Sequence, residues 1–256
     1  MRGPRLRTGR KDPSGGFTLV EALVALAVLL ILVILTGYGV AQVRKAGLGI
    51  KNMQSHRTIA AALLAYATEH GRLPYAREEK AVSSAPFAGQ EVTYPRTLTA
   101  LGYITDPSIF FGPQAGQWYT SYSKVLQHPQ TGSTIPWYYT NYGVNRTGAM
   151  PKNEKGYLPA RLSDIASDGN LSKLMLLRDC YDASMDTATS RRGGGVVFFA
   201  GTTEMPPPEK TYQGKVYATF ADGHTVAYPR EALIELLKNN PNGEPPLFGR
   251  KYIVKP

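Results

Sequence analysis

The most distinctive chemical group in the sequence is a single carboxylate at the edge of a long apolar run. Glu21 directly precedes fourteen consecutive apolar residues, Ala22 to Leu35, and no charged side chain occurs from Ala22 to Val43. An unpaired carboxylate at this position in a membrane costs on the order of a few kcal/mol. Either Glu21 stays solvated at the level of the lipid headgroups, or a positive charge created elsewhere neutralises it. The residues before it favour neutralisation.

Cleavage of the chain between Gly16 and Phe17 would supply that charge. The new N-terminus would carry a free α-amine on Phe17, four positions before Glu21. The amine of one chain could then neutralise the carboxylate of a neighbouring chain, which would favour packing of one helix beside another. On this hypothesis Gly16 and Phe17 are the processing residues, and Phe17 and Glu21 are the assembly residues.

The apolar run is long enough to cross a bilayer, because about 20 such residues span the hydrocarbon core as a helix. A secretory signal peptide has a shorter apolar region and a cleavage site of small residues directly after it. Residues 36–39, the nearest candidate for such a site, fit that pattern poorly. Residues 1–16 hold five basic residues and one acidic residue. The positive-inside rule therefore predicts a cytoplasmic N-terminus, although Lys45 and Lys51 weakly oppose this orientation.

The segment Gly16-Phe17-Thr18-Leu19-Val20-Glu21, with its basic leader and the apolar helix after it, resembles the prepilin cleavage and methylation motif. This motif belongs to type IV pilins and type II secretion pseudopilins. The resemblance implies that a prepilin peptidase cleaves between Gly16 and Phe17 and that the new amine is N-methylated. It implies as partners the peptidase/methyltransferase, other pilin-like subunits, an inner-membrane assembly platform and the membrane lipid.

Other groups that could do chemistry show no catalytic arrangement, and no enzyme is predicted. The sequence contains no HExxH, GxSxG, Walker-type or GxGxxG motif. The single cysteine, Cys180, allows no intrachain disulfide and is expected to be buried and inert. The net charge of +10 includes +4 in the leader, and the remaining basic residues are scattered without a dense run, which argues against nucleic acid as a partner. The histidines are His56, His70, His128 and His224.

Three weaker possibilities remain for the residues after the long helix, 71–256, which are called the head. The resemblance to some pseudopilin heads suggests a calcium site, without the fixed loop of an EF-hand; otherwise no metal or cofactor is predicted. Its candidate ligands are Asp179, Asp182 and Asp186. Asp222 and His224 could form a metal or acid–base pair, but a turn alone accounts for Asp222. Trp118 and Trp137 could line a sugar-binding surface, although core packing is favoured.

The element that positions the N-terminal motif is a helix that continues past the membrane. Apolar residues recur at three- and four-residue spacing from Ile59 to Ala67, and Gly71 and Pro74 are typical of a helix end. The helix is therefore predicted over residues 17–70. Its four central glycines predict a local bend or melted turn. They are Gly37, Gly39, Gly47 and Gly49.

The remaining residues predict an α+β head with an antiparallel sheet packed on the outer half of the helix, a pilin-like arrangement. Strands are expected within residues 136–145, 174–179 and 196–200. Two more, at residues 216–221 and 225–228, flank Asp222-Gly223, a two-residue hairpin signal. A closing helix is expected over residues 230–240. The predicted organisation is a leader at 1–16, a transmembrane helix at 17–43, its periplasmic half at 44–70 and a globular head at 71–256.

Several head segments resemble one branch of the pseudopilin-like proteins. The similar elements are Tyr142-Gly143-Val144-Asn145, residues 161–165 and Phe220-Ala221-Asp222-Gly223-His224. Arg191-Arg192-Gly193-Gly194 departs from the Arg-His-Gly of that branch, and residues 195–215 resemble an inserted loop.

These features predict a structural subunit of a type II secretion or type IV pilus-like filament. A secretion pseudopilin is preferred because the chain lacks a cysteine pair and because its head resembles the pseudopilin-like branch. The alternative is a minor tip or surface binding module that recognises a secreted substrate, polysaccharide or DNA. The expected location is the bacterial inner membrane, with a single span and a periplasmic head, and a periplasmic or surface filament after assembly.

Overall fold

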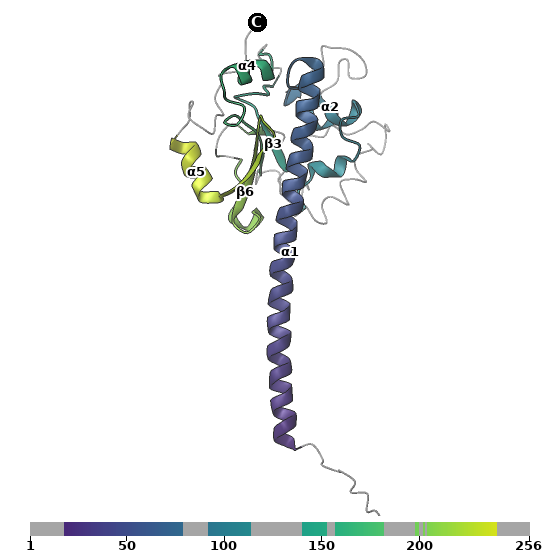
Figure 1. Cartoon of the computed structure of the whole chain (residues 1–256), viewed down its shortest axis with the longest axis vertical. Helices are drawn as coiled ribbons and strands as arrows, with labels where there is room; N and C mark the ends of the chain where they lie inside the picture. Colours follow the sequence, from purple (N-terminus) through teal and green to yellow (C-terminus); the bar gives the residue numbers. More distant parts are fainter. Residues whose placement is uncertain are drawn as a thin grey trace, which may run out of the picture. The chain divides into compact units, whose positions relative to one another are not determined.

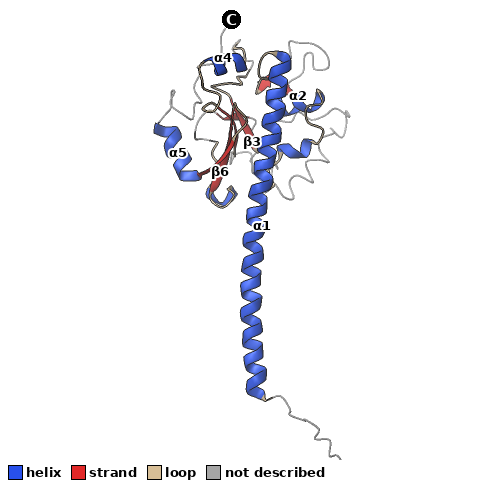
Figure 2. Ribbon diagram, viewed as in Figure 1, coloured by secondary structure: helices blue, strands red, loops and turns tan. Residues whose placement is uncertain are grey.

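The structure is a computed structural model that describes residues 18–78, 92–113, 140–152, 157–181, 198–199, 202 and 204–239. The chain divides into two compact units, Met1–Arg44 and Lys45–Pro256, which are described separately. A long apolar N-terminal helix and a mixed set of helices and strands confirm the predicted α+β, pilin-like fold class (Figures 1 and 2).

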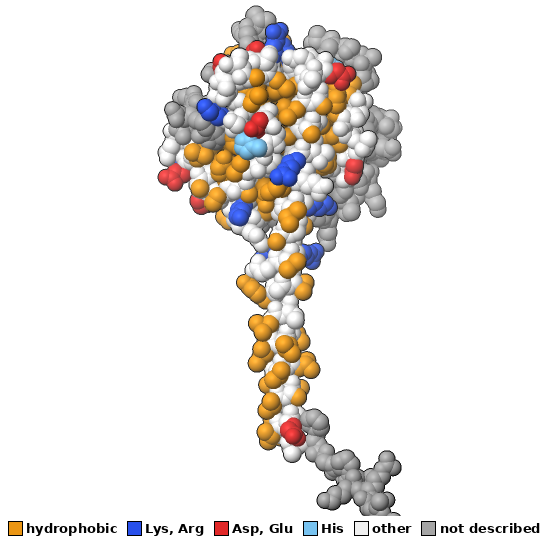
Figure 3. Space-filling view, viewed as in Figure 1, with side chains coloured by type: hydrophobic (Ala, Val, Ile, Leu, Met, Phe, Trp, Pro, Cys, Tyr) orange, Lys and Arg blue, Asp and Glu red, His pale blue; other side chains and the backbone are white. Residues whose placement is uncertain are grey.

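Helix α1 runs from Leu19 to His70. In the first unit its large apolar side chains, from Leu19 to Val43, are exposed (Figure 3). By length and composition α1 could cross a membrane, and it is the one such helix in the part of the chain that the structure describes. The predicted melted turn does not form, since Gly37 to Gly49 lie within the helix. Each glycine costs up to about 1 kcal/mol relative to alanine, but the residues between the central glycines include good helix formers such as Gln42, Arg44 and Lys45, which add little to that cost.

In the second unit α1 buries the predicted apolar stripe. Ile59, Leu63 and Ala67 have exposed fractions of 0, 0 and 4%. Gly71 follows the last turn with φ +72°, a left-handed conformation that glycine adopts without strain. The chain then leaves the helix axis, and the N–H of Leu73 donates to the carbonyl of Ala160 at 3.0 Å.

A five-stranded sheet with the order β5-β3-β4-β6-β7 forms the centre of the second unit. Its strands are β3 (Tyr142–Asn145), β4 (Met175–Asp179), β5 (Phe198–Phe199), β6 (Lys215–Phe220) and β7 (Thr225–Pro229). Neighbouring strands are antiparallel except β5, which pairs parallel to β3. The predicted antiparallel sheet is confirmed for β3, β4, β6 and β7, and β5 adds a parallel pairing at the edge that no local sequence signal indicated.

The β6–β7 hairpin forms at Asp222-Gly223 as predicted, but its loop is one residue longer than a two-residue turn. The N–H of Phe220 donates to the carbonyl of His224, and the N–H of Gly223 donates to the carbonyl of Phe220. Gly223 has φ +87°. This is the three-residue loop in which a type I turn is followed by a left-handed residue, a role that suits glycine.

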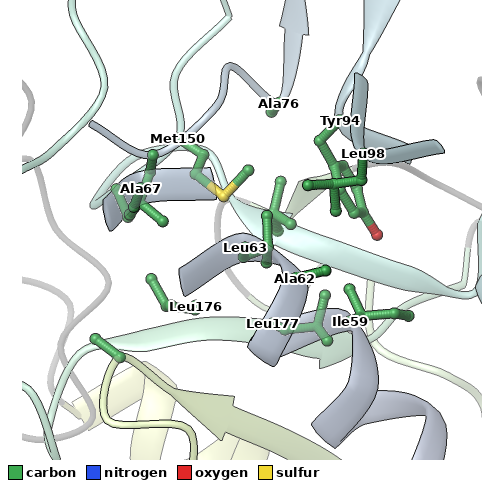
Figure 4. Packing of buried hydrophobic residues seen from close by; sticks show 14 of the residues in the cluster. Ile59, Ala62, Leu63, Ala67, Ala76, Tyr94, Leu98, Met150, Leu176 and Leu177 are labelled. Carbon is green, nitrogen blue, oxygen red and sulfur yellow. The ribbon is translucent and has the colours of Figure 1, made fainter. Parts of the chain in front are cut away.

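Two clusters of buried apolar side chains lie on opposite faces of this sheet. Consecutive residues of β4 divide between them: Leu176 packs with Ile59 and Leu63 of α1 (Figure 4), and Met175 packs with Leu233 of α5. The closing helix α5 (Arg230–Asn239) agrees with the prediction, of which residue 240 lies outside the described residues. The other elements are β1 (Arg77–Glu78), β2 (Val92–Thr93), α2 (Tyr94–Ala100), η1 (Pro107–Phe110), α4 (Leu162–Ser167) and η3 (Pro208–Lys210).

Candidate functional site

The first turn of α1 is closed by reciprocal hydrogen bonds between Thr18 and Glu21. The N–H and the hydroxyl of Thr18 both donate to Glu21 Oε2 at 2.9 Å, and the N–H of Glu21 donates to Thr18 Oγ1 at 3.2 Å. This capping box satisfies N–H groups that have no partner within the helix. Thr18 is therefore a capping residue that the sequence reasoning missed, although Thr-x-x-Glu before an apolar run is the recognised signature of a capping box.

The capping box leaves part of the Glu21 carboxylate available. Of the two Glu21 carboxylate oxygens, only Oε2 accepts hydrogen bonds from the described residues. Oε1 can therefore accept a further donor. Gly16 and Phe17 lie outside the described residues, and the structure tests neither cleavage between them nor pairing of the Phe17 amine with Glu21.

A second group of polar residues is buried where α1 packs on the sheet. His56 Nε2 lies 2.8 Å from Asp179 Oδ1, and His56 Nδ1 lies 3.0 Å from Thr219 Oγ1. The Asn52 amide donates to both Asp179 oxygens, at 3.0 and 3.2 Å. The backbone N–H of Tyr217 donates to Asp179 Oδ2 at 2.7 Å. We name five side chains the junction cluster: Asn52, His56, Tyr142, Asp179 and Thr219.

The junction cluster is excluded from solvent. The exposed fraction is 6% for Asp179 and 0% for the other four residues. The Tyr142 hydroxyl donates to Asn52 Oδ1 at 2.8 Å, and the Tyr142 ring packs edge-on against His56. Because burying a polar group without a hydrogen bond costs free energy, these mutual partners explain how polar side chains are tolerated here. The cluster ties α1 to β3, β4 and β6 by directional contacts.

The local sequence of α1 places this cluster on the buried stripe. Asn52 and His56 are one helical turn apart, and Ile59 and Leu63 continue the same face. One turn before Asn52, a Cβ on Gly49 would lie 2.8 Å from the hydroxyl oxygen of Tyr217, so glycine permits this close approach. The sequence reasoning missed the cluster, although two polar residues in register with an apolar stripe could have indicated it.

The chain of Asp179, His56 and Thr219 has the group types of a hydrolytic triad. Its hydroxyl, on Thr219, is fully buried and also lies 2.9 Å from Thr225 Oγ1. In this conformation a substrate cannot reach that oxygen. The arrangement therefore serves packing and orientation.

The electrostatics of the cluster keep its phenol neutral. Burial raises the pKa of Tyr142 well above its ordinary value, and the nearby Asp179 carboxylate raises it further. Burial and the same carboxylate also raise the pKa of Tyr217. A neutral Tyr142 retains the proton that it donates to Asn52.

The predicted calcium ligands are only partly described. Both oxygens of Asp179 already accept N–H donors, and its side chain is buried. Asp182 and Asp186 lie outside the described residues. The described part of the chain contains no group of three or more His, Cys, Asp or Glu side chains placed to hold a metal ion. Calcium binding stays an untested prediction.

The other sequence candidates fall at separate places. Asp222 Oδ1 accepts the backbone N–H of His224 at 3.0 Å and also contacts the His224 ring, which stacks on Phe220, so this pair shapes the hairpin turn. Cys180 is buried as predicted, and burial raises its pKa to about 11. His70 stacks on Tyr66 at the surface. His128, Trp118, Trp137 and residues 191–194 lie outside the described residues.

Comparison with known protein families finds a match at the N-terminus of the chain. The family described as "Prokaryotic N-terminal methylation motif" matches residues 12–37, which include the predicted cleavage position, the capping box and the start of the apolar helix. The match supports a pilin-like precursor and, with it, processing by a prepilin peptidase and assembly with other pilin subunits. No curated protein and no solved structure matched the chain.

Proposed function

We propose that the chain is a pseudopilin-type subunit of a type II secretion or type IV pilus-like filament, processed between Gly16 and Phe17. The observation that carries the proposal is the coincidence of three features within one segment. The methylation motif covers residues 12–37, α1 begins within it at Leu19, and the large apolar side chains that follow on α1 are exposed. Exposed apolar surface of this extent requires a lipid or protein partner.

In this proposal the same helix has two successive environments. Before assembly, residues 17–43 span the inner membrane once, with the N-terminus cytoplasmic and the head periplasmic. After assembly, the apolar side chains of α1 pack against those of neighbouring subunits, and the heads face outward. The absence of a cysteine pair and the head's similarity to the pseudopilin-like branch support a secretion pseudopilin over an adhesive or motility pilin.

Glu21 links the two environments. Its carboxylate is costly in hydrocarbon unless it is paired, and the Phe17 amine of a neighbour would pair it. Glu21 Oε2 can keep the capping bonds to Thr18 while Oε1 accepts the amine. Neutralisation of Glu21 thus stabilises one register of neighbouring helices, and the capping hydrogen bonds of both helices are kept.

The test separates charge pairing from helix capping. The chain is expressed in bacterial cells that supply a prepilin peptidase and an assembly platform, and filaments are collected by shearing and counted by electron microscopy. Glu21→Leu is expected to be processed but not assembled. The matched control Thr18→Ala removes the cap side chain but keeps the carboxylate, and is expected to assemble. Filaments of Glu21→Leu in wild-type numbers would refute the role of Glu21.

A further inference from the structure

The basic residues that follow the apolar run are not explained by the proposed function. Arg44, Lys45 and Lys51 fall within eight positions, and the sequence from Ala22 to Thr68 contains no acidic residue. All three basic side chains are exposed on α1. Positive charge on the translocated side of a span opposes the positive-inside rule. Their exposure next to the span makes them available to a partner of opposite charge.

We propose that these three residues form a basic neck that binds the headgroups of anionic phospholipids in the outer leaflet of the inner membrane. The inference rests on the proposed function only in placing these residues on the periplasmic side of the membrane. Anionic headgroups attract basic residues next to a membrane span, and the attraction falls off within a Debye length.

The spacing along α1 sets which residues reach the lipid. From Val43, the last residue of the uncharged run, Lys45 is displaced about 3 Å and Lys51 about 12 Å along a helix that rises 1.5 Å per residue. The headgroup region is roughly 5–8 Å thick on each side, and a lysine side chain extends toward it. Arg57, at about 21 Å, is too far and is screened at physiological ionic strength.

Lys51 is the weaker member of the neck. It borders a cavity that Asp106 also lines, and the pKa of Asp106 is lowered by hydrogen bonds from Ser108 and, to a smaller extent, by the charge of Lys51. No acidic residue lies near Arg44 and Lys45 in the sequence, so no carboxylate among these described neighbours competes with the lipid for them. The main contribution is therefore assigned to the adjacent pair Arg44 and Lys45.

Removal of the leader changes the balance of charge between the two sides of the span. The precursor has five basic residues before the span, whereas a chain that begins at Phe17 has only its amine and Glu21 on that side. After cleavage the basic neck becomes the dominant charge flanking the span. It then sets the depth of the mature helix in the bilayer until assembly removes the subunit.

The experiment uses the full unprocessed chain in vesicles of phosphatidylcholine, with trace spin-labelled phosphatidylglycerol or phosphatidylcholine. Electron spin resonance gives the relative affinity for the two labelled lipids. The double variant Arg44→Gln/Lys45→Gln is expected to lower the preference for phosphatidylglycerol about fivefold or more, and Lys51→Gln less. Arg57→Gln, the control matched to Lys51→Gln, removes one positive charge farther along the helix and is expected to change nothing. Gln has nearly the helix propensity of Arg and Lys, so α1 is retained.

The leader is present in every variant, so its own attraction to anionic lipid is common to all of them. High salt is expected to abolish the difference between the wild-type chain and the double variant. An equal loss in Arg57→Gln and in the double variant, or a difference that salt leaves intact, would overturn the proposal. The measurement needs no peptidase or filament, so its failure is independent of a failure of the proposed function.

Discussion

Removal of the Asp179 carboxylate tests whether the junction cluster holds α1 on the sheet. Asp179 accepts from His56 Nε2 at 2.8 Å, from the Asn52 amide at 3.0 and 3.2 Å and from the Tyr217 N–H at 2.7 Å. Asp179→Ala deletes the acceptor of all three donors. His56 and Asn52 are fully buried, so water does not replace the lost acceptor without opening the core.

The magnitude follows from these contacts. A buried donor left without its acceptor costs about 1–3 kcal/mol, and Asp179→Ala removes the acceptor of three such donors. The variant is therefore expected to lower the free energy of unfolding of the second unit by about 4 kcal/mol. Asp179→Asn keeps the shape and one acceptor oxygen, and about half that loss is expected.

Urea unfolding of the purified chain in detergent micelles, followed by tryptophan fluorescence, measures these differences. The total stability of such a domain is about 5–15 kcal/mol, so the expected loss is large. Asp164→Ala is the matched control at an exposed aspartate, with an expected change within about 0.5 kcal/mol. A loss below about 1 kcal/mol for Asp179→Ala would refute the reasoning, because the three donors would then have found other partners.

Three further predictions concern the second unit. Gly49→Ala places a Cβ 2.8 Å from the Tyr217 hydroxyl and is expected to lower the free energy of unfolding by about 1–3 kcal/mol. Gly47 has open space around it, so Gly47→Ala is expected to raise the free energy of unfolding by up to about 1 kcal/mol. Urea unfolding of the two variants compares these effects. Burial raises the pKa of Cys180 to about 11, so a thiol reagent at neutral pH is expected to label the chain only after denaturation, and rapid labelling of the native chain would contradict the burial. The raised pKa of Tyr142 means that the folded state holds the phenolic proton more tightly than the unfolded chain. Its contribution to the free energy of unfolding is complete below about pH 10 and is lost above it at about 1.4 kcal/mol per pH unit. A Tyr142→Phe variant whose stability falls equally steeply at alkaline pH would exclude this residue as the cause.

The sequence predicted the elements whose signals are local. The apolar run and the stripe from Ile59 to Ala67 gave α1, and Asp222-Gly223 gave the position of the last hairpin. The loop length was wrong because Asp-Gly suits both a two-residue turn and the three-residue loop with a left-handed Gly223. Only the pairing of Phe220 with His224 distinguishes them.

The junction cluster and the parallel edge could not be derived in the same way. His56 finds its partners 123 and 163 residues away in sequence, at Asp179 and Thr219. No local period encodes such pairings, and β5 likewise pairs with β3 over a long separation in sequence, with Phe198 opposite Val144. The capping box differs, since Thr18 and Glu21 are three residues apart and their types alone indicate it.

The central claim is tested most directly by the N-terminus of the protein recovered from membranes of a bacterium that has a prepilin peptidase. Intact mass and N-terminal sequencing are performed on the wild-type chain and on Gly16→Ala. The account predicts a wild-type chain that begins at N-methylated Phe17, and a variant that keeps its first sixteen residues. A wild-type chain that retains its leader, or that is cut beyond residue 36, would contradict the pilin-like account.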